Sequence, residues 1–256
     1  MDKIRRNALK LSIIIPAHNE EENIGPTIKD IAAELRKEEI PFEIVAVNDN
    51  SRDGTESVIK RMQGEIPELV LVNRTLPAGF GRTIRTGLEH FTGDVVVPVM
   101  ADLSDDTKDI VRYYRKIEDG YDCVFGSRFT RKSVVKDYPR IKLFMNRMVN
   151  KMLQILFLTR HNDLTNAFKA YRSFVIKSIL PLHACHFNIT IEMSLSALIR
   201  QYNIASMPIN WYGRTWGQSK LRLNVMGRRY LATLLKIWFE RLLIIDDLMA
   251  EKKDID

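Results

Sequence analysis

The segment Phe42-Glu43-Ile44-Val45-Ala46-Val47-Asn48-Asp49 is a short apolar run that ends in a carboxylate. A second run, from Val95 to Met100, ends in the same way at Ala101-Asp102. Short apolar runs of this kind are typical of strands buried in a parallel sheet. Ligands of open α/β sheets bind outside the carboxyl ends of the strands, so we expect both acids to face one crevice. One carboxylate can then hold a nucleotide and the other a metal ion.

Strand and helix patterns alternate around these two runs through the first half of the chain. Five apolar runs predict strands, at 11–17, 42–47, 69–72, 95–99 and 122–125. Between them, apolar residues recur at helical spacing, as in the helix expected at about 107–118. This alternation predicts an α/β fold with a mostly parallel sheet that helices cover on both faces.

The composition indicates a globular chain, and its positive charge favours an anionic partner. The 256 residues are 45% hydrophobic, which is enough for a real core, and carry a formal charge of +7. Only two cysteines occur, Cys123 and Cys185, without the spacing of a zinc site or a disulfide framework, which fits a reducing cytoplasm. Nucleic acid is not an expected partner, because no helix-turn-helix or aromatic RNA-binding signature accompanies the charge.

The second half contains two basic amphipathic segments. The first, about 141–158, interleaves apolar residues with Lys142, Arg147 and Lys151. The C-terminal segment has one apolar stripe, made by Leu231, Leu234, Leu235, Trp238, Leu242 and Ile245. Either stripe can pack on the core or lie in a membrane interface. No uninterrupted apolar run reaches the roughly 20 residues of a membrane span, so a membrane contact is expected to be peripheral.

The loops after the predicted strands hold the candidate site residues. Pro16 and Glu20 follow the first strand, and Asp49 is placed to accept hydrogen bonds from a nucleotide base. Asp102 can supply one ligand to a hard divalent cation whose other ligands are phosphate oxygens and water. Asp105 and Asp106 are also good N-caps for the helix that follows.

A glycine-containing loop, 78–87, precedes another predicted helix. Gly79 and Gly81 either adopt positive φ angles or let the backbone approach a phosphate. The loop lacks the Gly-Lys-Ser/Thr of a P-loop, which argues against an NTPase.

These loops, in this order, resemble glycosyltransferase family 2. The likeness extends through Gly126-Ser127-Arg128-Phe129, through 163–169, and through Arg214-Thr215-Trp216-Gly217-Gln218-Ser219-Lys220-Leu221. It is closest to the polyprenyl-phosphate sugar transferases of the dolichol-phosphate mannosyltransferase type. The resemblance implies a nucleotide-diphospho-sugar transferase fold of the A type, a divalent metal (Mg²⁺ or Mn²⁺) and inversion at the anomeric carbon.

The resemblance also implies roles for individual residues. The nucleotide-sugar site would comprise Pro16, His18, Glu20, Asp49, Ala101 and Asp102. The metal would be held by Asp102 and Ser104, and the phosphates of donor and acceptor by Arg128, Arg214 and Lys220. Of these, the expected catalytic residues are Asp102, Arg128, Arg214 and Lys220. The family's Asp-x-Asp begins with an acid where this chain has Met100, so Asp105 is a further candidate metal ligand.

The implied reaction transfers a single hexose, mannose or glucose, from a nucleotide-diphospho-sugar such as GDP-mannose to a polyprenyl or dolichyl phosphate. Residues 1–221 would form the catalytic domain, and 222–256 an amphipathic helix and tail that dock on an anionic membrane surface at its cytoplasmic face. A phosphate monoester is already nucleophilic near neutral pH and needs no general base. Transfer to a saccharide or lipid hydroxyl is an alternative, which requires a carboxylate such as Asp163 or Glu192. A second alternative, prompted by Met100, is a catalytically silent nucleotide-sugar-binding protein.

Overall fold

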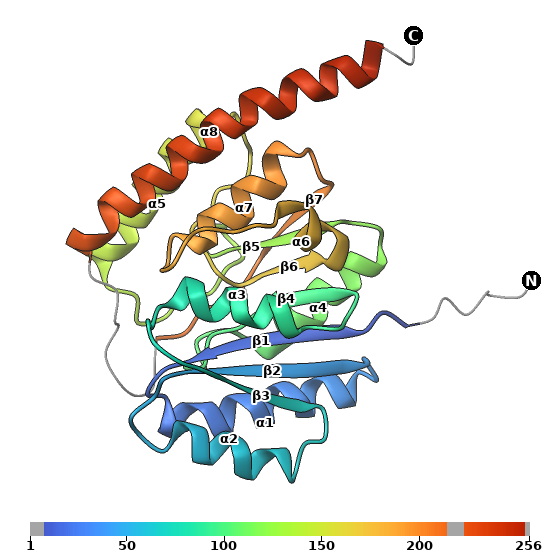
Figure 1. Ribbon diagram of the computed structural model, residues 1–256, viewed down its shortest axis with the longest axis vertical. Coiled ribbons are helices and arrows are strands. Elements are labelled where there is room, and N and C mark those ends of the chain that lie inside the picture. The colour runs from blue at the N-terminus through green and yellow to red at the C-terminus, as the bar shows by residue number, and fades with distance from the viewer. Residues whose placement is uncertain (1–7, 214–222, 254–256) are drawn as a thin grey trace, which may run out of the picture.

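A seven-stranded sheet forms the centre of the computed structural model, which describes residues 8–213 and 223–253 (Figure 1). Its strands are β1 (Leu11–Ala17), β2 (Phe42–Asp49), β3 (Leu69–Arg74), β4 (Val95–Pro98), β5 (Cys123–Ser127), β6 (Lys169–Arg172) and β7 (Ile204–Pro208). They lie in the order β3-β2-β1-β4-β6-β5-β7. Only β6 runs antiparallel to its neighbours among the described strands. The predicted mostly parallel α/β sheet is therefore confirmed.

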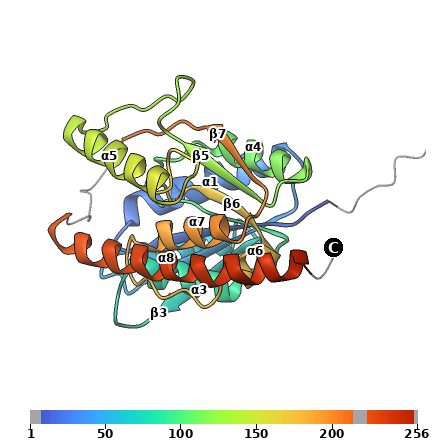
Figure 2. The same cartoon turned by 90° about the horizontal axis from the view of Figure 1, so that it is seen from above.

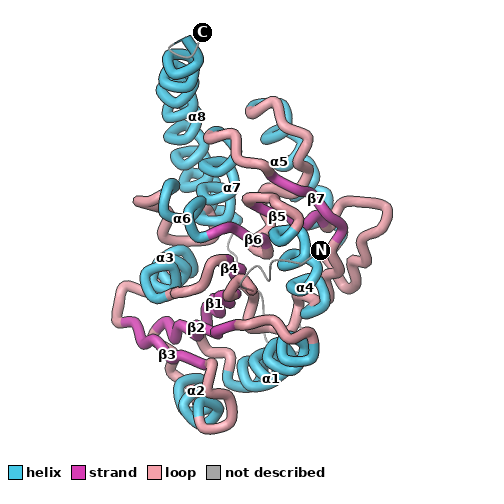
Figure 3. The backbone as a smooth tube through the Cα atoms, turned by 90° about the vertical axis from the view of Figure 1, so that its right-hand side faces the viewer, coloured by secondary structure: helices cyan, strands magenta, loops and turns pink. Residues whose placement is uncertain are grey.

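Helices cover both faces of the sheet, as Figure 3 shows. The described helices are α1 (Glu21–Lys37), α2 (Thr55–Gln63), α3 (Phe80–His90), α4 (Thr107–Glu118), α5 (Arg140–Leu156), α6 (Ser173–Ile179), α7 (Ile189–Ile199) and α8 (Leu223–Lys253). Helices α1, α2 and α4 pack on one face, and α3, α6 and α7 on the other. The predicted domain boundary between 221 and 222 lies outside the described residues.

Strand β1 shows how the apolar runs create two cores. Ile13 and Ile15 belong to the cluster that includes α1, whereas Ile14 belongs to the cluster that includes α3. Successive side chains of a strand point to opposite faces, so a strand covered on both sides must be apolar throughout. The first-half strands carry that pattern, which explains why their positions could be predicted.

The second half contains elements that the sequence patterns did not indicate. Strands β6 and β7 are short, and all residues of α7 except Leu198 are buried. A helix surrounded by protein has no polar face and therefore no amphipathic period. Burial on all sides thus explains why α7 was missed.

Helices α5 and α8 lie at the end of the molecule opposite α2 in Figure 1, and Figure 2 shows them from above. They meet where Arg241 Nη1 donates a hydrogen bond to the Leu156 carbonyl oxygen at 3.3 Å. The exposed apolar residues of α5 are Ile141, Phe144, Met145, Met148, Met152, Ile155 and Leu156. Those of α8 are Leu231, Leu235, Phe239, Leu242 and Leu243. We call these residues together the apolar end surface.

Few members of the two predicted apolar stripes are buried in the core. Leu153 is the buried apolar residue of α5, and Leu234 is the one member of the predicted α8 stripe that is buried. Core packing therefore accounts for only part of these two stripes. Within the described residues, no helix combines the length and apolar character needed to cross a bilayer.

At the amino ends of the strands, Glu43 ties three segments together. Its carboxylate accepts hydrogen bonds from Lys10 Nζ at 2.7 Å, Ser12 Oγ at 2.6 Å and the Thr92 amide at 2.5 Å. Burial by itself raises the pKa of Glu43, but these hydrogen bonds outweigh burial and lower it to about 2. The ionised carboxylate is therefore part of the folded structure.

Glu43→Gln tests this role, because it removes the charge and keeps the shape. At pH 7 we expect the variant to be less stable by about 2 kcal/mol. The folded-state pKa of Glu43 is depressed, so the wild-type advantage should shrink as pH falls from about 4.5 toward 2. Urea unfolding of both proteins at pH 7, 4 and 3 measures this difference in stability. A difference that does not change with pH would show that the charge is not its source.

Candidate active site

Asp49, the last residue of β2, joins three segments at the carboxyl edge of the sheet. Its Oδ1 accepts a hydrogen bond from Arg74 Nη1 at 2.5 Å, and its Oδ2 accepts one from the Gly79 amide at 2.7 Å. Arg74 ends β3 directly opposite Asp49 in the strand register. Sequence reasoning missed Arg74, although its place at the end of the third strand was a usable signal. These two hydrogen bonds fix the position of the Asp49 carboxylate, which we expect to contact the nucleotide base.

The loop after β1 lies against the loop after β2. His18 Nδ1 is 2.7 Å from the Asp49 carbonyl oxygen, and the Glu20 amide donates to Thr55 Oγ1 at 2.8 Å. Glu20 is 9% exposed and accepts a hydrogen bond from Asn23 Nδ2 at 2.9 Å. Pro16 pairs with Val47 in the register of β1 and β2. The predicted nucleotide residues of the first two loops are thus neighbours.

Asp102 lies four residues beyond the end of β4, in a tightly bonded loop. It is 4% exposed, and its Oδ1 accepts a hydrogen bond from the Ser104 amide at 3.2 Å. The Ala101 carbonyl oxygen accepts from Thr27 Oγ1 at 3.1 Å, which ties the loop to α1, the helix that begins just after Glu20. Helix α1 therefore links the predicted metal loop to the predicted nucleotide loops.

Asp105 closes the same loop. Its Oδ2 accepts a hydrogen bond from the Met100 amide at 3.0 Å. Burial raises the pKa of Asp105 to about 7, and the nearby Asp102 charge acts in the same direction. Asp106 caps α4 by accepting a hydrogen bond from the Lys108 amide at 3.0 Å, as predicted.

The loop fits a metal that takes few ligands from protein. In the described ranges, no group of three His, Cys, Asp or Glu side chains is arranged to hold a cation. A hard divalent cation bound to a diphosphate usually needs only one or two protein carboxylates, because phosphate oxygens and water complete its shell. Asp102 meets that requirement, whereas Ser104 contacts Asp102 through its backbone.

Arg128 and Asp163 form a buried ion pair beyond the end of β5. Arg128 Nε and Nη2 donate to the two oxygens of Asp163, each at 2.8 Å, and the Arg128 amide donates to Oδ2 at 3.0 Å. The side chains are 9% and 1% exposed. Burial alone lowers the pKa of Arg128, but Asp163 outweighs it and the pKa is raised. Arg128 thus keeps its charge, with only part of its guanidinium left for a phosphate.

The Glu192 carboxylate is likewise buried, hydrogen-bonded and ion-paired. Its side chain is 1% exposed, and it accepts hydrogen bonds from the Ala184 amide at 2.7 Å and Lys236 Nζ at 2.8 Å. Both carboxylates considered as a general base, Asp163 and Glu192, are therefore held in ion pairs. Arg214 and Lys220 lie outside the described residues.

Gly79 and Gly81 make room for another segment of backbone. A Cβ atom at Gly81 would lie 2.5 Å from the Ala184 carbonyl oxygen, and one at Gly79 would lie 2.5 Å from that of Cys185. The Gly81 amide donates to the Cys185 carbonyl oxygen at 3.1 Å. The glycines thus allow close packing of two loops, and the amide of Gly79 is used by Asp49.

Comparison with known proteins agrees with this architecture. Glucosyl-3-phosphoglycerate synthase from Mycobacterium tuberculosis, solved with Mn²⁺, uridine-diphosphate and phosphoglyceric acid, superposes with a TM-score of 0.69 at 20% identity. The superposition covers 90% of this chain and 78% of that chain. The same enzyme has been solved with Mg²⁺ and uridine-diphosphate, and that structure superposes with a TM-score of 0.68. The fold is that of the A-type nucleotide-sugar transferases.

The sequence assigns the family within that fold. Residues 12–180 match the model of glycosyl transferase family 2. The chain belongs to this family.

Two curated relatives are polyprenyl-phosphate sugar transferases by name. Undecaprenyl-phosphate 4-deoxy-4-formamido-L-arabinose transferase of Shewanella sediminis (strain HAW-EB3) is 29% identical over 184 residues, which cover 71% of this chain and 54% of that protein. Dolichol-phosphate mannosyltransferase of Pyrococcus furiosus (strain ATCC 43587 / DSM 3638 / JCM 8422 / Vc1) is 27% identical over 220 residues, covering 84% and 60%. The matches thus span less than two thirds of either relative.

Asp163→Asn tests the buried ion pair. The substitution leaves the Arg128 charge buried without its counter-charge, so we expect a loss of about 3 kcal/mol in the free energy of unfolding. Urea denaturation of the purified chain measures it. Asp119→Asn is the control, because Asp119 and Lys116 form an exposed pair; its unfolding midpoint should stay at the wild-type value. Equal midpoints for the two variants would contradict the proposed importance of the pair.

Proposed function

We propose that the chain transfers a single hexose, with inversion, from a nucleotide-diphospho-sugar to a polyprenyl or dolichyl phosphate. The names of the two curated relatives support this acceptor class. The observation that carries the proposal is the state of the two candidate bases. Asp163 is paired with Arg128, and Glu192 with Lys236. Because both carboxylates are held in ion pairs, the site suits a nucleophile that needs no deprotonation.

A phosphate monoester is such a nucleophile. Its second pKa is about 6, so it is mostly dianionic at neutral pH. The principal task of the protein is then to hold two highly charged phosphate groups together. Arg128, Arg214 and Lys220 would bind those groups through charge-assisted hydrogen bonds. Asp163 would keep the Arg128 guanidinium in one orientation, because it fixes two of its nitrogens.

The donor would lie along the loops at the carboxyl edge of the sheet. Asp49 would accept hydrogen bonds from the base, with Pro16, His18 and Glu20 beside it. Asp102, with Ala101 and Ser104 in its loop, would hold Mg²⁺ or Mn²⁺. Bound there, a divalent metal supplies Lewis-acid stabilisation of the charge on the departing nucleotide diphosphate. Mannose on GDP is the donor we favour, with glucose on UDP as the other choice.

Product analysis tests the transfer. Incubating the chain with radiolabelled GDP-mannose or UDP-glucose, polyprenyl phosphate and Mn²⁺ should move the label into the organic phase. Asp102→Ala should lower the rate by about a hundredfold or more, since it removes the proposed metal carboxylate. Asp119→Asn is a charge-matched control far from the strand-end loops and should retain the wild-type rate.

The possible outcomes separate the competing functions. Label that stays water-soluble in a new product would contradict the lipid-phosphate acceptor and indicate a saccharide acceptor. Donor binding without any turnover, in the presence of metal, would identify a silent nucleotide-sugar-binding protein.

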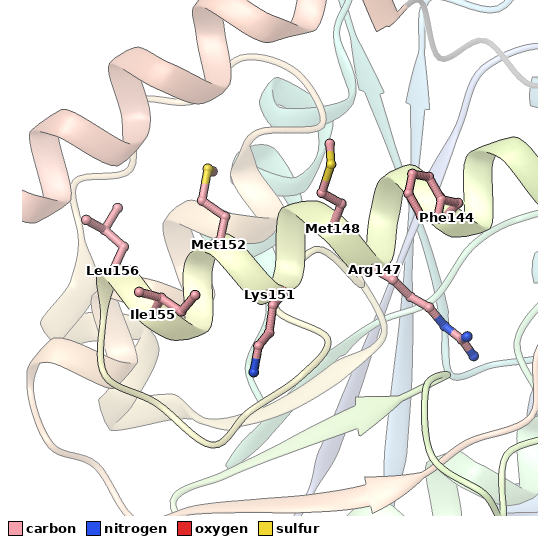
Figure 4. Close-up of a pocket in the computed structure, with 7 residues that line it drawn as sticks. All are labelled: Phe144, Arg147, Met148, Lys151, Met152, Ile155 and Leu156. Carbon is pink, nitrogen blue, oxygen red and sulfur yellow. The ribbon is translucent and has the colours of Figure 1, made fainter.

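The apolar end surface would dock on the cytoplasmic face of a membrane. It contains an open groove along α5, lined by Phe144, Arg147, Met148, Lys151, Met152, Ile155 and Leu156 (Figure 4). In Figure 4, Met148 and Met152 leave one side of the helix, whereas Arg147 and Lys151 point to the other. Apolar side chains flanked by cations suit a surface of anionic lipid. Docking there would bring the site to a lipid-borne acceptor.

Vesicle flotation tests the docking. Arg147→Gln/Lys151→Gln should weaken binding to phosphatidylglycerol vesicles by about 1 kcal/mol per charge, or about thirtyfold, and added salt should weaken wild-type binding. Lys60→Gln, at an exposed position of α2 at the other end of the molecule, is the control and should bind like wild type. Binding that is indifferent to anionic lipid would exclude this mode of attachment.

A further inference from the structure

A basic cavity lies where the start of α3, the segment 183–188 and α8 meet. Its volume is about 420 Å³, and its lining does not include Asp49, Asp102 or Arg128. Figures 1 and 3 show α3, α7 and α8 on the same face of the sheet, so this junction brings distant parts of the chain together. Among the described residues that line it are three permanent cations, Arg82, Arg229 and Lys236, and one carboxylate, Glu192.

The carboxylate offsets only one of these three positive charges, that of Lys236. Glu192 is already satisfied by two backbone amides and by Lys236. Within the described ranges, neither Arg82 nor Arg229 forms an ion pair, and Arg82 donates to the Ala78 carbonyl oxygen at 3.2 Å. The pKa of His186 is lowered by burial and, in addition, by the charges of Arg229 and Arg82. The cavity is therefore a region of positive potential.

Asn188 connects the segment 183–188 to α8 through Thr233. The residue lines the cavity, is 6% exposed, and its Oδ1 is buried without a hydrogen-bond partner in the described structure. The orientation of the amide is fixed, because Nδ2 donates to Thr233 Oγ1 at 2.9 Å while Thr233 donates to the Arg229 carbonyl oxygen. These two hydrogen bonds tie the segment 183–188 to α8 beside Arg229.

We propose that this cavity binds a phosphoryl group. Arg82 and Arg229 would pair with the phosphoryl oxygens. Guanidinium groups suit this purpose because their planar N–H donors match phosphoryl oxygens in pairs. The site is separate from the donor phosphates that Asp102 would hold.

The source of the phosphoryl group is either a free solute or a lipid headgroup. On α8, Leu231 and Leu235 of the apolar end surface are exposed next to Ala232 and Lys236, which line the cavity. A headgroup could therefore enter from a docked membrane, whereas a small phosphate could enter from solution. In either case the cavity adjoins the base side of the crevice, because a Cβ atom at Gly79 would lie 3.3 Å from His186 Cε1.

Cys185 provides a reporter that does not depend on turnover. It lines the cavity and is partly exposed, whereas Cys123 is fully buried. Alkylation of the native chain should therefore modify Cys185 first. Inorganic phosphate should slow this alkylation at least threefold and in a saturable way, and sodium chloride at the same ionic strength should not. Vesicles of phosphatidylglycerol, compared with phosphatidylcholine, test the headgroup source in the same assay.

Two neighbouring arginines give a matched pair of variants. Arg229→Gln removes a cavity cation and should raise the phosphate or phosphatidylglycerol concentration for half-protection about tenfold. Arg228→Gln removes the same charge from the exposed residue beside it and should leave that concentration unchanged. Protection by phosphate identifies a solute site, and protection by phosphatidylglycerol alone identifies a headgroup site. Protection equal to that of sodium chloride, or equal effects of the two variants, would overturn the proposal, whatever the chain's transferase activity.

Discussion

The carboxylate of Asp49 is the constraint on which the candidate site depends. It holds the end of β2 to the end of β3 through Arg74 and to the start of α3 through Gly79. A buried carboxylate is stable only when it is paired or hydrogen-bonded, and here the partners come from two other elements. Asp163 and Glu192 follow the same rule, with partners distant in sequence. The loops are thus held in place before any ligand arrives, which reduces the ordering needed on binding.

Much of the fold could be predicted from the sequence, because the first-half strands and helices carry clear apolar periods. The structure confirms β1 at 11–17 and places α4 at Thr107–Glu118. The site was less predictable. The acids at strand ends were visible, but the pairing of Arg128 with Asp163 joins residues 35 positions apart, and no local pattern encodes it. Similarly, α7 and the short β6 lack the periods from which elements are recognised. The roles assigned to individual side chains remain predictions.

The two amphipathic helices and the basic cavity belong to one end of the molecule. Helix α8 contributes to both: Leu234 and Ile237 pack on the core, Leu231 and Leu235 are exposed, and Lys236 reaches Glu192. A helix with this division of faces couples a surface to the interior, because a shift of α8 would alter the lining of the cavity. The net charge of +7 therefore indicates only that the partner is anionic. The positions of the individual cations decide which anion binds.

Strand β6, which runs antiparallel to both of its neighbours, affects how the site is assembled. Strands that run parallel deliver their following loops to the crevice, but β6 runs the other way, so the crevice receives the segment that precedes it. Asp163 arrives by this route, ahead of Lys169, whereas Arg128 arrives after β5. Insertions before β6 would consequently disturb the crevice, and insertions after it would fall at the opposite edge. The site is thus assembled from segments that follow parallel strands and from one segment that precedes the reversed strand β6.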